Sequence, residues 1–160
     1  MVSNPTIATF AAVFIALYIA HSVGDHWVQS SCQAATKGLP GWTGRAACAR
    51  HILSLTATKA VVLAPVALLL DLPLTMAGLL LGLGLDAASH YWADRRTTLA
   101  RLAQTCGKAE FYSLGTPSHP AHPATAEGTY APTLGTGAYA LDQSFHHLFL
   151  GVAALLIATV

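Results

Sequence analysis

The chain has 160 residues, of which 54% are hydrophobic and only 9% are charged, and its formal net charge is +1. Soluble domains usually carry roughly 25% charged residues, so this composition predicts an integral membrane protein organised as one unit. The small net charge excludes the broad basic field that attracts nucleic acid. We therefore expect the lipid bilayer as a partner, and no nucleic acid.

Four apolar stretches follow one another along the chain, and they predict an all-α, polytopic membrane protein. About 20 apolar residues cross a bilayer as a helix, and each stretch has that length. The expected transmembrane helices are residues 5–28, 51–70, 73–92 and 137–160. They would form one bundle, a single domain over residues 1–160.

The connecting segments differ in length and composition. Residues 30–50 are polar and contain glycine and proline, which predicts a loop. A tight turn at Asp71–Pro73 joins the second and third helices, and residues 95–104 are expected to continue the third helix as a polar extension. Residues 105–135 are rich in Pro, Gly, Thr and Ala, which predicts a long polar loop, either a lid or an exposed loop.

Basic residues gather in two of the three expected loops. Seven of the eight Lys and Arg residues lie in the first and third loops: Lys37, Arg45, Arg50, Arg95, Arg96, Arg101 and Lys108. With four spans, both loops lie on the same side of the membrane. Because cytoplasmic loops carry an excess of Lys and Arg, we expect this side to be cytoplasmic and both termini to lie outside the inner membrane.

Histidines and aspartates recur four residues apart where the expected helices reach the cytoplasmic side. This spacing places both side chains on one helix face. The sets are His21/Asp25, Asp86/His90/Asp94 and Asp142/His146, and all fall at one depth. Ionisable groups at the edge of a bilayer are costly and are usually kept for function.

Carboxylate and imidazole groups at this spacing suit a divalent cation such as Zn, Mg, Mn or Fe. Helix bundles build such sites from inward-facing positions on several helices. The expected ligands are His21, Asp25, Asp86, His90, Asp142 and His146. Two alternatives remain open, namely Asp–His hydrogen bonds that only fix helix packing and a proton or ion pathway.

Other polar residues have expected roles in catalysis or substrate binding. We expect Asp94 or His51 to act as general base or to orient a ligand, although His51 could also be a ligand or a plain interfacial histidine. Lys59 lies in the middle of a span and could bind an anionic substrate group or act as a counter-ion. Gln29 and Gln143 would hold ligands or substrate by hydrogen bonds.

Two further patterns concern packing and redox state. Gly78 and Gly82 form a small-residue face suited to close helix contact. Cys32, Cys48 and Cys106 lack CxxC spacing, so we expect free thiols rather than a disulfide framework or a zinc site.

The polar residues also form boxes that extend over the whole bundle. They are His21-x-x-x-Asp25-x-x-x-Gln29, a histidine opening the second span (His51), His90-x-x-x-Asp94, and Asp142-Gln143-x-x-His146. As a set, these boxes resemble a family of small, uncharacterised four-helix membrane proteins of bacteria and phages. The resemblance covers all four spans but not residues 105–135, and it implies the architecture and the same polar residues without an activity. In style, the boxes are also similar to those of membrane-bound metal-dependent hydrolases.

These observations predict a metal-dependent, membrane-embedded hydrolase that acts on a lipid-like substrate, at a phosphate or ester group, on the cytoplasmic interface. Water bound to the metal would be the nucleophile. The alternative is a non-enzymatic membrane protein with a structural Asp/His network, either an ion or proton conductor or an oligomeric phage or bacterial membrane component. A haem held by paired histidines is less favoured, because each of them has an aspartate partner. In all cases the chain could form a homo-oligomer.

Overall fold

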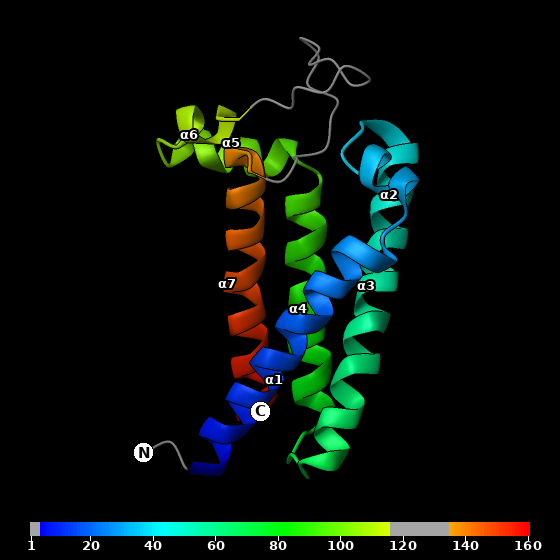
Figure 1. Ribbon diagram of the computed structural model, residues 1–160, viewed down its shortest axis with the longest axis vertical. Coiled ribbons are helices and arrows are strands. Elements are labelled where there is room, and N and C mark those ends of the chain that lie inside the picture. Colours follow the sequence, from blue (N-terminus) through cyan, green and yellow to red (C-terminus); the bar gives the residue numbers. More distant parts are fainter. Residues whose placement is uncertain (1–3, 116–134) are drawn as a thin grey trace.

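The computed structural model describes residues 4–115 and 135–160, and every regular element in these two ranges is helical. Four long helices pack together, and three short ones lie at one end of them (Figure 1). The long helices are α1 (Asn4–Val23), α3 (Gly41–Leu69), α4 (Met76–Asp94) and α7 (Gly137–Thr159). The short ones are α2 (Ser31–Thr36), α5 (Thr97–Thr105) and α6 (Ala109–Ser113), and a π-helical turn, η1 (Gly24–Val28), extends α1.

Within the two described ranges, three helical segments are long and apolar enough to cross a membrane, namely Pro5–Val28, Gly41–Leu69 and Gly137–Thr159. This confirms the coarse prediction of an all-helical chain with candidate membrane helices. The fourth long helix, α4, is not among the three. Its first half is apolar, but its second half carries Asp86, His90 and Asp94.

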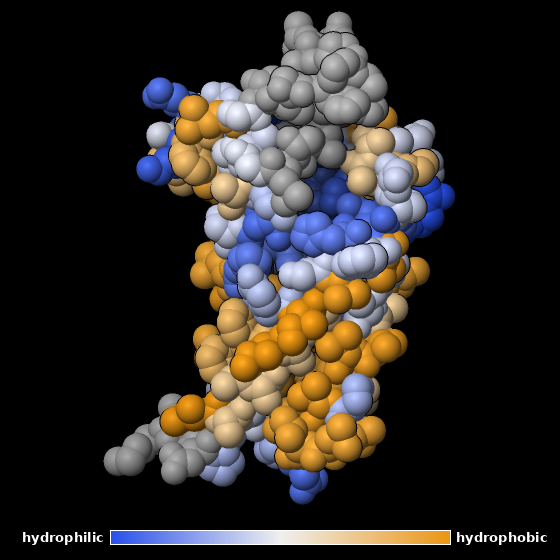
Figure 2. Space-filling model, in the orientation of Figure 1, coloured by the Kyte–Doolittle hydropathy of each residue, from blue (hydrophilic) through white to orange (hydrophobic). Residues whose placement is uncertain are grey.

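Polar and apolar surfaces are separated along the long axis of the molecule. Figure 2 shows apolar side chains over the lower part and a polar band just below the short helices. α1 begins and α7 ends at the apolar end, opposite α2, α5 and α6 (Figure 1). The polar chemistry of the described chain is therefore concentrated at one end of the bundle.

The core of the apolar part is formed by buried side chains of α1, α3 and α7, and partly buried side chains of α4 pack against it. Its buried members include Leu17, Leu150 and Ile157, which are all less than 2% exposed. α4 can approach α7 closely because Gly82 has no Cβ. A Cβ atom there would lie 2.7 Å from the carbonyl oxygen of Ala153. A Cβ at Gly78 would lie 3.1 Å from the carbonyl oxygen of Ile157. The small-residue face predicted for this helix is confirmed.

The prediction of a loop over residues 30–50 is wrong for most of that range. α2 forms within it, because the Ser30 hydroxyl accepts from the Gln33 backbone N–H and the Gln33 side chain accepts in return from the Ser30 N–H. α3 then begins at Gly41, ten residues earlier than expected, directly after Pro40. Glycines in this segment suggested a loop, but Gly44 is a packing residue here, because its bare Cα faces the Leu39 carbonyl.

The third helix does not continue straight into residues 95–104. α4 ends at Asp94, and Arg96 has a φ of 57°, a left-handed conformation that breaks the helix before α5 begins. Between α3 and α4 the chain turns at Leu70–Asp71, close to the predicted turn, and α4 begins at Met76, three residues after the expected start at Pro73.

Part of the predicted 105–135 loop is described, and part is not. Residues 109–113 form α6, while residues 116–134 lie outside the described residues, so the lid hypothesis is not addressed. Cys32, Cys48 and Cys106 are free thiols, as predicted.

Candidate metal centre

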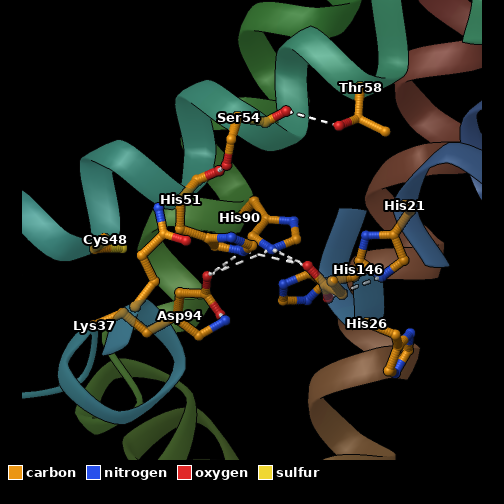
Figure 3. A network of polar contacts seen from close by, with 12 residues as sticks. His21, His26, Lys37, Cys48, His51, Ser54, Thr58, His90, Asp94 and His146 are labelled. Carbon is orange, nitrogen blue, oxygen red and sulfur yellow. Dashed lines mark hydrogen bonds and ion pairs between the residues drawn. The ribbon is translucent and has the colours of Figure 1, made fainter. Parts of the chain in front are cut away.

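Three segments bring their polar side chains together at the end of the bundle that carries the short helices. His51 comes from α3, His90 and Asp94 from α4, and Asp25 from η1. Figure 3 shows the rings of His51 and His90 turned toward each other beside Asp94. We call these four residues the ligand cage.

The π turn at the end of α1 helps to position Asp25. The backbone N–H of Gln29 donates to the Gly24 carbonyl at 2.9 Å, five residues back, so one extra residue is accommodated in this turn. Gly24 also has no Cβ, and a Cβ there would overlap the end of the Leu55 side chain of α3. η1 can therefore lie close against α3, which brings Asp25 within reach of His51.

The four atoms of the ligand cage lie at distances expected around one metal ion. His51 Nε2 is 3.2 Å from Asp25 Oδ1 and 3.3 Å from Asp94 Oδ2. His90 Nε2 is 3.7 Å and 3.5 Å from the same two oxygens. Nitrogen and oxygen ligands held about 2.1 Å from a tetrahedral ion are themselves about 3.4 Å apart. His51, His90 and Asp94 offer atoms that all lie within 4.8 Å of one another, and Asp25 adds an oxygen close to both imidazoles, so this part of the chain could hold a metal ion.

None of these four atoms has a hydrogen-bond partner within the described chain, although all four are buried. Buried polar atoms are normally hydrogen-bonded, because leaving one unsatisfied costs about 1–3 kcal/mol. A purely structural Asp–His network would satisfy them through hydrogen bonds to one another. Here the contacts lack that geometry, whereas a single cation would satisfy all four atoms together.

Asp142 and His146 of α7 form a second group with Asp94. We call the ligand cage together with these two residues the cluster. One carboxylate oxygen from each aspartate and one ring nitrogen of His146 lie within 4.8 Å of one another. His146 Nδ1 lies 2.8 Å from the Asp142 carbonyl oxygen, which fits a tautomer that donates there, and the opposite Nε2 is buried and unpartnered. An imidazole anchored through one nitrogen with the other open is typical of a metal ligand. This second group shares Asp94 with the ligand cage.

His21 borders the ligand cage without being one of its four members. Its Nε2 lies 3.2 Å from Gln143 Oε1 and 3.6 Å from Asp25 Oδ2, while its Nδ1 is buried and has no partner among the described residues. His21, Asp25 and His90 can also each offer an atom within 4.8 Å of the others. Its ring lies between α1 and α7, 5.2 Å from the His146 ring.

Lys37 approaches the ligand cage from the segment that follows α2. Its Nζ lies 2.8 Å from Asp94 Oδ1, the oxygen that does not face the two histidines. Burial by itself would lower the pKa of Lys37, but the carboxylates of Asp94 and Asp25 raise it above its ordinary value. The ammonium group therefore stays charged and compensates part of the negative charge of the three aspartates.

Two consecutive arginines at the end of α4 hold the segment that carries Lys37. The Arg95 guanidinium donates to the carbonyl oxygens of Lys37 and Leu39. Arg96 donates from Nη2 to the Ala34 carbonyl at 2.6 Å. Because five N–H donors sit in a rigid plane, an arginine can fix several carbonyls at once.

The structure places Asp86 away from the cluster, although it was a predicted ligand. Its Oδ2 accepts from Lys59 Nζ at 2.5 Å, and both side chains are buried. Asp86 belongs to none of the three groups able to hold a metal. Lys59, a predicted substrate-binding residue, is likewise fully buried and occupied by this ion pair, which fits its other expected role as a counter-ion.

A cavity of about 210 Å³ adjoins the cluster. It is lined by the carboxylates of three aspartates and by hydrogen-bond donors from η1, the α2 region, the end of α4 and the start of α7. The lining residues are Asp25, His26, Gln29, Ala34, Lys37, Asp94, Arg96, Tyr139, Asp142 and Gln143. Gln29 and Gln143, both predicted substrate contacts, are among them.

Sequence reasoning grouped most of these residues but missed several that shape the site. Lys37, Arg96 and Tyr139 line the cavity and belong to no recurrent spacing. The sequence signal for Lys37 and Arg96 is their position in the basic loops, a pattern that indicates membrane topology. His51 stands in the ligand cage, one of the alternatives that its position had left open.

No family model, curated protein or solved structure matches the chain. A function for it is therefore inferred from the chemistry of its own residues.

Proposed function

We propose that this chain is a membrane-embedded, metal-dependent hydrolase acting on a lipid-like substrate, at a phosphate or ester group, on the membrane interface. The observation that carries the proposal is the ligand cage. Its four buried, unpartnered atoms are spaced for one ion, and they lie beside a cavity large enough for a substrate group.

The donor set supports some cations more than others. Two imidazole nitrogens and two carboxylate oxygens suit Zn, and such mixed sets also suit Mn or Fe. Mg prefers an octahedral shell made mostly of oxygen, including several waters, which fits a buried cage with two histidines less well.

A divalent cation held here would lower the pKa of a water molecule and polarise the substrate group. In the hydrolysis that we propose, the water oxygen forms a bond to phosphorus or to the carbonyl carbon. The ester bond breaks, and the proton released by water passes to the departing alcohol. Asp142 is suited to carry this proton, because it lines the cavity and is not one of the four cage residues. Gln143 Nε2 lies 3.4 Å from Asp142 Oδ2 and would orient it.

We further propose that α4 spans the bilayer together with the three more apolar helices. The polar side chains of its second half contact Lys59 and the ligand cage. α4 can therefore cross the bilayer without exposing these polar groups to the acyl chains. The short helices and the basic residues would lie on the cytoplasmic side, and both termini outside.

Metal analysis of detergent-purified protein tests the proposal directly. We expect at least one Zn, Mn or Fe ion per wild-type chain, and a loss of most of this metal in Asp25→Asn, because the amide keeps the shape but removes the charge of a ligand. Asp71→Asn is the matched control: Asp71 is exposed on the turn after α3 and has a left-handed backbone that asparagine also tolerates.

One outcome would contradict the proposal. A metal-free wild type, with an Asp25→Asn variant that unfolds at the wild-type temperature, would leave the cluster as a structural polar network and end the hydrolase proposal. In that case the amide would still hydrogen-bond to imidazole.

A further inference from the structure

The cavity is lined by cationic and amide groups as well as by carboxylates. Lys37 and Arg96 contribute cationic groups, and Gln29 and Gln143 contribute amides. Lys37 is paired with Asp94, and Gln143 with Asp142, in the same lining. The donors come from three stretches far apart in the chain, residues 29–37, 96 and 139–143, which the fold brings to one space beside Asp25 and Asp94.

One donor in the wall has no partner at all within the described chain. The Nε2 atom of Gln29 is buried, and it makes no hydrogen bond. Gln29 follows η1 directly, so its side chain reaches the cavity beside Asp25, which belongs to the ligand cage. A buried amide N–H without a partner is costly, and a ligand oxygen in the cavity would satisfy it.

Charge distinguishes the two substrate groups that the proposed function leaves open. A carboxylic ester is neutral and presents one carbonyl oxygen, for which one or two donors suffice. A phosphate ester carries negative charge on two or three terminal oxygens, and Arg and Lys are the side chains that usually bind them. The carboxylates of Asp25, Asp94 and Asp142 also line this cavity, and a divalent cation in the ligand cage would, together with Lys37 and Arg96, more than balance their negative charge. With the metal bound, the two cations and the unpartnered amide match the second group.

We propose that this cavity binds a phosphate group, with Gln29, Lys37 and Arg96 contacting its terminal oxygens above the ligand cage. The inference rests on the proposed function and narrows its substrate class to phosphate esters. The surroundings allow the phosphate to belong to a lipid: next to Gln29, the apolar side chains of Trp27 and Val28 are 86% and 44% exposed. Exposed tryptophan beside polar groups is typical of a membrane interface.

The test is a calorimetric titration of the full-length, metal-loaded protein in detergent with inorganic phosphate. We expect saturable binding to wild type and a loss of roughly tenfold or more in affinity for Gln29→Ala, since a hydrogen bond to a charged group is removed. Gln104→Ala is the matched control, because Gln104 is exposed on α5 and does not line the cavity; its affinity should equal that of wild type.

Two further titrants identify the source of the phosphate. A short-chain phosphatidic acid that binds at least tenfold more tightly than inorganic phosphate indicates a lipid headgroup, whereas equal affinities indicate a soluble phosphate. Diacylglycerol of the same chain length lacks the phosphate and should not bind. If it binds as tightly as the phosphatidic acid, the phosphate is not what the cavity recognises, and the inference is overturned.

Metal analysis of the same samples separates this inference from the proposed function. Protein that contains its metal but does not bind phosphate, or that binds it equally well after Gln29→Ala, overturns the phosphate inference and leaves the hydrolase proposal standing. Protein that purifies without metal and cannot be loaded overturns both.

Discussion

Two aspartates on the same face of α4 have different partners. Asp86 and Asp94 are each four residues from His90, yet Asp94 belongs to the ligand cage and Asp86 forms an ion pair with Lys59. Bringing a lysine and an aspartate out of water costs several kcal/mol, which their mutual attraction offsets only when both are present. The pair therefore stabilises the fold only as a unit.

Removing one member of this pair should be far more damaging than removing both. We expect Asp86→Asn to lower the free energy of unfolding by about 3–5 kcal/mol, because the Lys59 ammonium stays buried without its counter-ion. The double variant Lys59→Met/Asp86→Leu should recover most of the loss. Thermal unfolding in detergent measures both effects.

The metal content of the same Asp86→Asn variant should equal that of wild type, provided that it is purified folded. A loss of metal in this variant would show that Asp86 is a ligand after all, and that its pairing with Lys59 is not its main role.

At the scale of whole elements, the contact between α4 and α7 sets the position of the cluster. α4 carries His90 and Asp94, and α7 carries Asp142 and His146. Gly78 and Gly82 allow the two helices to approach closely below the site. In the absence of a hydrophobic effect between helices in lipid, such close packing is a main source of their association.

Adding one methyl group at this contact should separate the helices. A Cβ at Gly82 would lie 2.7 Å from the Ala153 carbonyl oxygen and 2.5 Å from the Ile157 side chain, so Gly82→Ala should destabilise the protein by about 1–3 kcal/mol. Gly84→Ala is the matched control, because a Cβ there meets nothing within 4 Å. Because alanine favours a helix over glycine by up to about 1 kcal/mol, the Gly84→Ala control should be at least as stable as wild type.

Thermal unfolding of the two alanine variants in detergent checks this. Equal melting temperatures for Gly82→Ala and Gly84→Ala would mean that the small-residue contact does not hold α4 against α7. A lower melting temperature for Gly82→Ala alone is the expected outcome.

At the scale of the molecule, the polar site lies at the end opposite the start of α1 and the end of α7. α2, α5 and α6 share one end with the cluster, while α1 begins and α7 ends at the other (Figure 1). If the basic end faces the cytoplasm, as positive-inside asymmetry predicts, a substrate would enter from the cytoplasmic leaflet.

Accessibility of single thiols tests this orientation. Cys32 and Cys106 are exposed near the short helices, and Cys48 is buried, so Cys32→Ser leaves Cys106 as the one exposed native thiol of the described chain. We expect a membrane-impermeant maleimide to label it in inverted vesicles and not in intact spheroplasts. Adding Val160→Cys to a Cys106→Ser/Cys32→Ser background should give the reverse pattern. Labelling of Cys106 from outside would invert the topology and move the site to the outer leaflet.

The sequence by itself determined the helical class, the apolar segments and the residues able to carry chemistry. These properties are local: the apolar runs needed for spanning and the spacing of His and Asp on one helix face depend on neighbours within a few turns. Where local signals were weak, the boundaries were wrong, as at Gly41, where α3 begins within a segment rich in glycine. The π turn at Gly24 had no signal either.

Only the tertiary structure decided which polar groups meet. His51 and Lys59 are eight residues apart on α3, and Asp86 and Asp94 are eight apart on α4. Because α3 and α4 are antiparallel and in register, His51 faces Asp94 and Lys59 faces Asp86. Either aspartate could have been a ligand from spacing alone, since each lies one turn from His90. The register of two helices depends on side chains packed along their whole length, and no spacing within one helix contains that information.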